Sequence, residues 1–245
     1  MSAVWYCTRQ EAGPLVKECR ALRPRLTRYD SPYERALKNK VLHPARDSAV
    51  CHTPVDRLEL RLALMGWDAT HYTLTFDDDH LPPDYKDARR QWHNFCLKLQ
   101  RHSPHAPMDY IRCIEGKHGD HRYHYHIVLR DQDFSPAEIR HLWVGGEDVD
   151  DEPVLRQPRD SFARLARYFN KERSDGIVLP IDSKPWTCSR SLTAQLPAVQ
   201  RWEDSSGVIE IPDNVFASGR NSVENEFGSY YYAWYIKPKQ SLILK

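Results

Sequence analysis

The sequence predicts an α+β fold in which helices cover one face of a central antiparallel sheet. Apolar runs with strand-like alternation occur at residues 71–76, 109–116 and 122–130. The last two are separated by a short link that contains two glycines, which is typical of a hairpin. Segments with helical spacing lie between and after these strands. The order of strand, helix, two strands, helices and strand suits a ferredoxin-like sheet with its second face open.

Each element of this central region has a local signal. In chain order we expect strand 71–76, helix 82–101, hairpin strands 109–116 and 122–130, helix 135–143, an acidic loop at 147–152, helix 160–172 and strand 183–189. Pro82 and Pro83 lead into the first helix, which carries apolar residues at helical spacing. Ser135 is a capping residue, and Pro136 occupies the first helical position of the next helix. These signals define a domain at residues 67–192.

Segments on either side extend this domain. Residues 1–66 are interpreted as a basic, partly helical N-terminal extension, and residues 193–245 as a C-terminal extension with strands. The expected elements are helices around Leu15–Arg28 and Tyr33–Val41, and strands at 208–211 and 230–235. The first fifty residues carry ten Lys/Arg against five Asp/Glu, although the whole chain has a formal charge of only +1. Such a basic segment suits contacts with a nucleic-acid backbone.

Composition argues against a membrane-spanning or secreted protein. The 245 residues are 40% hydrophobic, the mean hydropathy is −0.70, and no apolar run approaches the ~18 residues of a membrane span. The first seven residues lack a basic and an apolar signal region, so we expect a cytoplasmic location, with Cys96 and Cys113 as buried free thiols. The sequence has no phosphate-binding glycine loop of the ATPase type, so any helicase must be a separate protein.

Two histidines in the last hairpin strand form a candidate metal site. His124 and His126 share one face of that strand, since strand side chains alternate. If Gly119-Asp120 forms a two-residue turn, His118 pairs with His121 and Glu115 lies opposite His124. One carboxylate and two imidazoles can bind one divalent ion. The alternative is a pair of ordinary strand histidines, because about 0.6 His-x-His matches are expected by chance.

A helix downstream presents a tyrosine between two cations. The stripe Phe162, Leu165, Ala166 and Phe169 has helical spacing and is expected to pack on the core. Tyr168 lies off this stripe and shares its face with Arg164 and Lys171. These cations would attract a phosphodiester and favour the phenolate that attacks it. The alternative is a surface tyrosine whose ring packs on the stems of the two side chains.

Together these motifs resemble the HUH endonucleases, which include rolling-circle replication initiators, relaxases and single-strand transposases. The matching pieces are His124-Tyr125-His126, the upstream Glu115, Tyr168-Phe169-Asn170-Lys171 and the strand His71–Phe76, which is similar to the first motif of the family. Their order, spacing and single tyrosine are most similar to replication initiators of small plasmids and phages, over roughly residues 70–190. Tyr125 departs from the usual middle residue, which lacks a hydroxyl.

The resemblance implies a metal-dependent DNA endonuclease and strand transferase with a tyrosine nucleophile. Glu115, His124 and His126 would hold Mg²⁺ or Mn²⁺, which polarises the scissile phosphate. Tyr168 would attack to give a 5′-phosphotyrosine and a free 3′-hydroxyl, and Lys171 would offset the charge that develops on the phosphate. The fold that the resemblance implies is the same ferredoxin-like sheet.

The implied partners are single-stranded DNA at the hairpin of a replication origin, and the helicase and DNA polymerase of a bacterial host. Arg164, Arg122 and His118 are candidate DNA contacts. Alternatives stay open: an HUH transposase or relaxase, a metal-dependent hydrolase in which water attacks and Tyr168 is structural, or a non-catalytic nucleic-acid-binding ferredoxin-like module.

Overall fold

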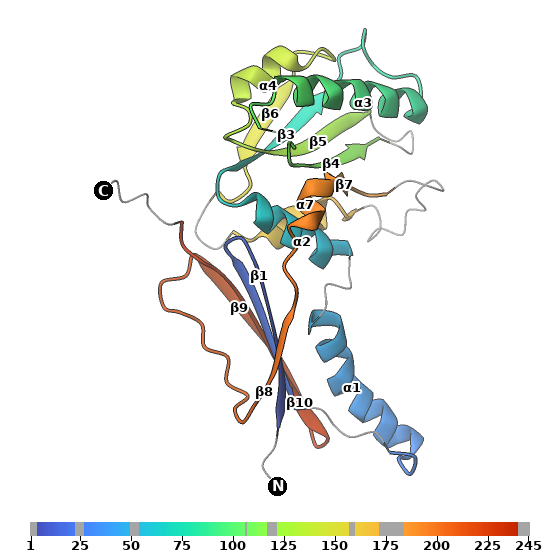
Figure 1. Cartoon of the computed structure of the whole chain (residues 1–245). Helices are drawn as coiled ribbons and strands as arrows, with labels where there is room; N and C mark the ends of the chain where they lie inside the picture. The colour runs from blue at the N-terminus through green and yellow to red at the C-terminus, as the bar shows by residue number, and fades with distance from the viewer. Residues whose placement is uncertain are drawn as a thin grey trace, which may run out of the picture. The chain divides into compact units, whose positions relative to one another are not determined.

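The computed structural model divides the chain into two compact units, each with its own five-stranded sheet (Figure 1). It describes residues 4–22, 27–49, 54–105, 107–116, 122–156, 160–171 and 184–239. The central unit comprises residues 64–156 and 162–196, and the terminal unit comprises 1–63, 157–161 and 197–245. No helix in the described part of the chain combines the length and the apolar character needed to cross a membrane.

The sheet of the central unit is antiparallel and has the strand order of a ferredoxin-like fold. Its strands are β3 (Ala69–Thr75), β4 (Tyr110–Glu115), β5 (His124–Arg130), β6 (Val149–Pro153) and β7 (Thr187–Cys188). They lie side by side in the order β6-β3-β5-β4-β7. The first four strands in the chain therefore take the spatial order fourth, first, third, second, and β7 is added beyond β4. The predicted α+β class and ferredoxin-like sheet are confirmed.

Two helices cover the face of this sheet that lies away from the histidines. They are α3 (Tyr85–His102), capped by Asp84, and α4 (Pro136–Leu142), capped by Ser135 in a capping box with Glu138. The core beneath them is apolar and aromatic, with Trp92, Phe95 and Leu99 from α3, Ile139 and Leu142 from α4, and Tyr72, Leu74, Ile114, Tyr125, Ile127 and Leu129 from the strands. Tyr125, the departure from the family motif, points into this core, and its hydroxyl donates to the Ala88 carbonyl.

The opposite face of the sheet meets α5 (Phe162–Tyr168). The Phe169 ring lies against the rings of His71 and His126, with centroid distances of 5.6 and 5.8 Å. Short helix α7 (Arg190–Ala194) starts at the capping residue Ser189, close to the first residues of β4. The expected strand at 183–189 is shorter in the structure, where only Thr187–Cys188 pairs, with β4.

The acidic segment at 147–152 is not a loop, so that prediction is wrong. Val149–Pro153 forms edge strand β6, paired with β3 on one side only. Val149 is buried, whereas Asp150 and Asp151 are exposed. A run of charged residues hides the strand in the sequence, yet an edge strand tolerates charge, since it has solvent on its free side.

The terminal unit joins both ends of the described chain in one antiparallel sheet. Its strands are β1 (Trp5–Ala12), β2 (Leu15–Leu22), β8 (Gln200–Asp204), β9 (Ala217–Asn225) and β10 (Gly228–Ile236), in the order β8-β1-β2-β10-β9. The helices α1 (Pro32–Ala49) and α2 (Pro54–Met65) follow β2 in the chain. The N-terminal hairpin is thus inserted between strands from the C-terminal segment.

Two secondary-structure predictions for this unit are wrong. The segment predicted as a helix at Leu15–Arg28 begins with strand β2. β2 is a central strand with Leu15 to Cys19 all buried, so it lacks the alternation that identifies a half-exposed strand. Residues 208–211 form no strand, whereas strand 230–235 is confirmed within β10, and the helix at Tyr33–Val41 lies within α1.

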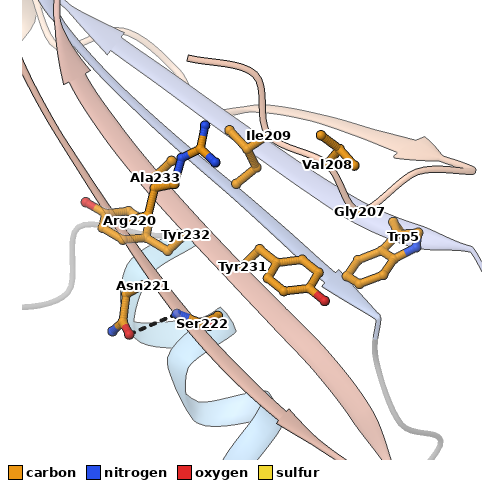
Figure 2. Close-up of a pocket in the computed structure, with 10 residues that line it drawn as sticks. All are labelled: Trp5, Gly207, Val208, Ile209, Arg220, Asn221, Ser222, Tyr231, Tyr232 and Ala233. Carbon is orange, nitrogen blue, oxygen red and sulfur yellow. Dashed lines mark hydrogen bonds between the residues drawn. The ribbon is translucent and has the colours of Figure 1, made fainter.

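An aromatic pair lines a hollow of about 520 Å³ on the sheet of the terminal unit (Figure 2). The Trp5 and Tyr231 rings stack with centroids 5.2 Å apart and an interplanar angle of 23°. Val208 and Ile209 border the hollow, and a Cβ at Gly207 would come within 2.5 Å of the Trp5 ring. The segment after β8 therefore packs closely on this face, which explains why it makes contacts with side chains instead of pairing as a strand.

Candidate metal centre

Backbone pairing in the central sheet brings the three predicted metal ligands together. β4 pairs with β5 so that Glu115 lies opposite His124, as the sequence predicts. On the other side of β5, Thr73 of β3 lies opposite His126. Because side chains alternate along strands, Glu115, His124 and His126 share one face of the sheet. The predicted pairing of His118 with His121 falls outside the described residues.

These side chains form a compact and largely buried cluster. One ligand atom from each lies within 4.8 Å of the others. His124 Nε2 is 3.0 Å from Glu115 Oε2, and His126 Nε2 is 3.4 Å from Glu115 Oε1. Glu115 and His126 are only 6% and 2% exposed, and His124 is half-buried. Two imidazole nitrogens beside a carboxylate suit a divalent cation, so the cluster could bind such a metal.

The pKa shifts in the cluster leave Glu115 ionised and His126 neutral, which are the forms in which these side chains bind a metal ion. Burial opposes the charge of Glu115, but hydrogen bonds from His124, His126 and Lys171 outweigh burial and hold its pKa far below the ordinary range. Burial lowers the pKa of His126, which is therefore neutral at neutral pH. The hydrogen bond to Glu115 raises the pKa of the more accessible His124. A bound cation would take the place of the proton that His124 shares with this carboxylate.

The end of α5 brings Tyr168 and Lys171 to the same cluster. The Tyr168 hydroxyl oxygen lies 3.3 Å from His126 Nε2, and the two rings are nearly perpendicular at a centroid distance of 5.2 Å. Lys171 Nζ lies 2.8 and 2.9 Å from the two carboxylate oxygens of Glu115, and 4.2 Å from the centroid of the Tyr168 ring. Two motifs separated by some forty residues in the sequence therefore converge on one site.

The structure corrects one expectation about Tyr168. Burial raises the pKa of its phenol, the Glu115 carboxylate raises it further, and Lys171 only partly opposes these two effects. Lys171 lowers the pKa of the phenol, as the sequence suggested, but it is bound to Glu115, and burial together with that carboxylate outweighs its effect. Tyr168 is 38% exposed, and it stays a neutral phenol in the metal-free site.

His71 and Glu152 belong to the site and were missed as candidates. His71 Nε2 lies 3.1 Å from His126 Nδ1, and His71 Nδ1 lies 3.3 Å from Glu152 Oε1. Burial lowers the pKa of His71 to about 3, so this imidazole is neutral. If His71 Nδ1 donates to Glu152, His71 Nε2 accepts from His126 Nδ1; in that tautomer His126 Nε2 carries a lone pair for a metal ion and gives up its hydrogen bond to Glu115.

A sequence signal for these residues existed. His71 and Thr73 are two residues apart on β3, so their side chains point to the same face of the sheet, and Thr73 lies opposite His126 on β5. Glu152 lies opposite His71 on β6, the strand hidden in the acidic run. Recognition of β6 would have revealed the partner of His71.

A cavity of about 460 Å³ adjoins Tyr168 on the β6 side of the site. Its walls include His71, His126 and Glu152 from the sheet, Arg156 after β6, and Arg164 from α5. The predicted position of Arg164 on the same face as Tyr168 is confirmed, since both line this cavity. The cavity gives Tyr168 a side from which a substrate can approach.

The remaining candidate DNA contacts lie elsewhere or are not described. Arg122 Nη2 donates to the Phe76 carbonyl at 2.9 Å, and Nη1 pairs with Asp78 at 2.5 Å. Arg122 therefore ties the start of β5 to the segment after β3. His118 falls outside the described residues.

The fold and the site together define an α+β domain with a metal-competent His-His-Glu cluster beside a tyrosine and a lysine. Residues 69–173 match a family model described as a replication-associated protein of the ORF2 type. The match spans less than half of the chain but contains every residue of the cluster. No curated protein and no solved structure gives a significant match. The family match is consistent with a Rep-type replication initiator and suggests a role in replication initiation, and the metal-competent cluster hints at an enzyme.

Proposed function

We propose that this protein is an HUH-type endonuclease that nicks and rejoins single-stranded DNA to initiate and terminate rolling-circle replication. The observation that carries the proposal is the convergence of Tyr168 and Lys171 on the Glu115-His124-His126 cluster. Tyr168 is 38% exposed, and its hydroxyl oxygen lies 3.3 Å from His126 Nε2, so a phosphate beside the cluster could be reached by this oxygen. The family match over the same residues supports a role in replication.

The proposed reaction is a transesterification at phosphorus. The Tyr168 oxygen forms a bond to the phosphorus and loses its proton, and the bond from phosphorus to the 3′ oxygen breaks. The 3′ oxygen gains a proton and leaves as a hydroxyl, while the 5′ phosphate stays on Tyr168. Because the number of ester bonds is conserved, attack by a 3′-hydroxyl on the phosphotyrosine rejoins the strand without ATP.

Each residue of the site has a separate task. Glu115, His124 and His126 would hold the ion, for which we propose Mg²⁺ or Mn²⁺. When bound, such an ion supplies Lewis-acid polarisation of the phosphate oxygens. His71 holds the His126 ring through its second nitrogen. Lys171 offsets the negative charge that develops on the phosphate as the phenol attacks.

The proposed partners follow from this chemistry. The substrate is single-stranded DNA at the hairpin of a replication origin, because a tyrosine recessed beside a cluster needs an unpaired, accessible backbone. Duplex opening and DNA synthesis are assigned to a host helicase and polymerase in the cytoplasm of a bacterial cell. Arg164 is proposed as a DNA contact, since it lines the cavity beside Tyr168.

The direct test is the covalent adduct. The protein is mixed with labelled single-stranded oligonucleotides from its own replicon, with Mn²⁺, Mg²⁺ or EDTA, and separated on denaturing gels. We expect a metal-dependent band of protein carrying DNA that is absent in Tyr168→Phe. Tyr33→Phe is the matched control, because Tyr33 is 71% exposed on α1 of the other unit, and this variant should form the adduct normally.

Two other outcomes would replace the proposal. Cleavage without an adduct would assign the attack to water and make Tyr168 structural. Binding without cleavage under any metal would leave a nucleic-acid-binding module as the function of this sheet.

A further inference from the structure

Helix α3 carries a row of basic side chains on the surface of the central unit. Lys86, Arg89, Arg90 and His93 occupy positions i, i+3, i+4 and i+7, so they follow one face of the helix, and all four are exposed. Arg90 pairs with Asp87 at 2.9 Å. Lys86, Arg89 and His93 have no acidic partner within the described part of the chain.

This row forms one wall of a basic groove. Two adjoining hollows, of about 220 and 420 Å³, share Tyr85, Arg89 and Arg112. The first is completed by Lys184, Pro185, Trp186 and Thr187, and the second by Lys86, Arg90 and His93. None of the residues that line either hollow is acidic, so the charged side chains that line the groove are all basic.

Arg112 is the most informative residue of the groove. It is half-buried on β4, its Nε donates to Thr187 Oγ1 at 2.6 Å, and its guanidinium lies 5.0 Å from the centroid of the Trp92 ring. No carboxylate pairs with it among the described residues. Burial lowers the pKa of Arg112 from its ordinary value, and the neighbouring Arg89 lowers it further. A half-buried cation without a counter-charge is costly, and an external anion would offset that cost.

We infer that the Arg89-Arg112-Lys86 groove binds the phosphodiester backbone of DNA that flanks the scissile phosphate. This inference rests on the proposed function and extends it to a second DNA-contact surface. Arg112 lies three residues before Glu115 on β4, about 10 Å along the strand, and alternation places its side chain on the opposite face. The groove and the metal centre therefore lie on opposite faces of β4, and in this proposal the DNA passes from one to the other around the edge of the sheet. Tyr85 and Trp186 in its walls offer aromatic surfaces beside the phosphates, as in single-strand binding grooves.

The test measures binding separately from cleavage. Affinity for labelled oligonucleotides of mixed sequence is measured by fluorescence anisotropy in EDTA, at several salt concentrations, with single-stranded and duplex probes. Lys86→Gln/Arg89→Gln removes two exposed charges, and Arg112→Gln removes the half-buried one. Arg101→Gln is the matched control, because Arg101 is exposed on α3 about two turns beyond His93, the last groove residue on this helix.

Each lost contact with a single strand should weaken binding about fivefold near 0.1 M salt. The double variant should therefore bind about 25-fold more weakly, and its plot of log K against log salt should be shallower by about 1.4, while Arg101→Gln matches wild type. A loss seen with the single-stranded probe assigns the groove to the unpaired strand, and a loss confined to duplex assigns it to the flanking duplex.

The inference is overturned if the double variant and Arg112→Gln both keep wild-type affinity and salt slope. The adduct assay tells this failure from failure of the proposed function. If wild type forms no adduct but the groove variants still lose binding, the groove stands and the nuclease proposal falls. If wild type forms the adduct and the groove variants bind normally, only the groove is refuted.

Discussion

Replacement of Lys171 should have opposite effects on metal binding and on strand cleavage. Lys171 Nζ lies 2.8 and 2.9 Å from the two oxygens of Glu115, so in the metal-free protein this ammonium occupies the carboxylate that a divalent ion needs. Metal binding must therefore break or weaken the ion pair. Lys171→Met keeps an unbranched side chain that ends at the Cε position and removes the competing charge.

The expected change in metal affinity follows from how far solvent reaches the Lys171–Glu115 ion pair. The Lys171 side chain is 42% exposed and that of Glu115 is 8% exposed, so solvent screens the pair partly, and it contributes about 1 kcal/mol. Without this competing ion pair, Lys171→Met should bind the metal ion about fivefold more tightly. Loss of the repulsion between the ammonium and the ion should tighten binding further. Cleavage should fall by about 100-fold or more, because the phosphate loses the charge that stabilises it.

Mn²⁺ titration by calorimetry, together with the adduct assay, measures both effects. Lys40→Met is the matched control, since Lys40 is exposed on α1 and should change neither quantity. Glu115→Gln sets the lower limit, because it removes the only anionic ligand of the cluster. Equal or weaker Mn²⁺ binding by Lys171→Met would refute the competition and would mean that Lys171 helps to hold the ion.

Three further perturbations test the packing around the site and in the terminal unit. His71→Phe removes the partner of His126 Nδ1 and should weaken Mn²⁺ binding 10- to 100-fold; unchanged affinity would exclude His71 from the site. Burial works against the charge of Asp109, yet hydrogen bonds from two serines, a glutamine and an arginine hold its pKa below the ordinary value. Asp109→Asn should therefore cost about 1.5–3 kcal/mol at pH 7 in urea unfolding, and its deficit should shrink below about pH 4, because the carboxyl of the unfolded wild-type chain takes up a proton there before the folded one does; a deficit that does not depend on pH would contradict this. Lys17→Met leaves the Glu59 carboxylate buried and short of a partner and should cost about 3–5 kcal/mol, whereas the double change with Glu59→Leu should recover most of that loss. A double variant that is no more stable than the single one would show that the pair is not the cause.

The β4–β5 hairpin was predictable because two strand-like runs lie on either side of a short link that contains two glycines. The sequence predicted Glu115 opposite His124 on the assumption of a two-residue turn, and the pairing of β4 with β5 confirms this register. Edge strand β6 and central strand β2 were missed for opposite reasons. β6 is too charged and β2 too uniformly buried to show alternation, and only their sheet neighbours explain why each is a strand.

The candidate site was predictable in its members but not in its electrostatics. Sequence spacing placed Arg164 and Lys171 on either side of Tyr168, and this was interpreted as two charges ready for a phosphate. The structure shows Lys171 bound to Glu115. No local rule gives this contact, because it joins residues that are 56 positions apart in the chain.

Backbone pairing holds one part of this site, and side-chain packing holds another. The metal ligands lie on strands whose relative positions are set by backbone hydrogen bonds, so they are in place before an ion binds. The tyrosine reaches the sheet through side-chain packing instead, where Phe169 rests on the rings of His71 and His126. Tyr168, the proposed nucleophile, is therefore positioned against His126, a proposed metal ligand, and a shift of His126 would move both together.

Lys171 is held in another way, by an ion pair with Glu115, and its side chain is partly exposed to solvent. It can exchange the Glu115 carboxylate for a phosphate oxygen without any change in the sheet. In the proposed reaction, an ion at Glu115 releases this ammonium at the place where negative charge then builds up. One lysine can thus neutralise the empty site and stabilise the transferred phosphate in the occupied one, which accounts for its position between Glu115 and Tyr168.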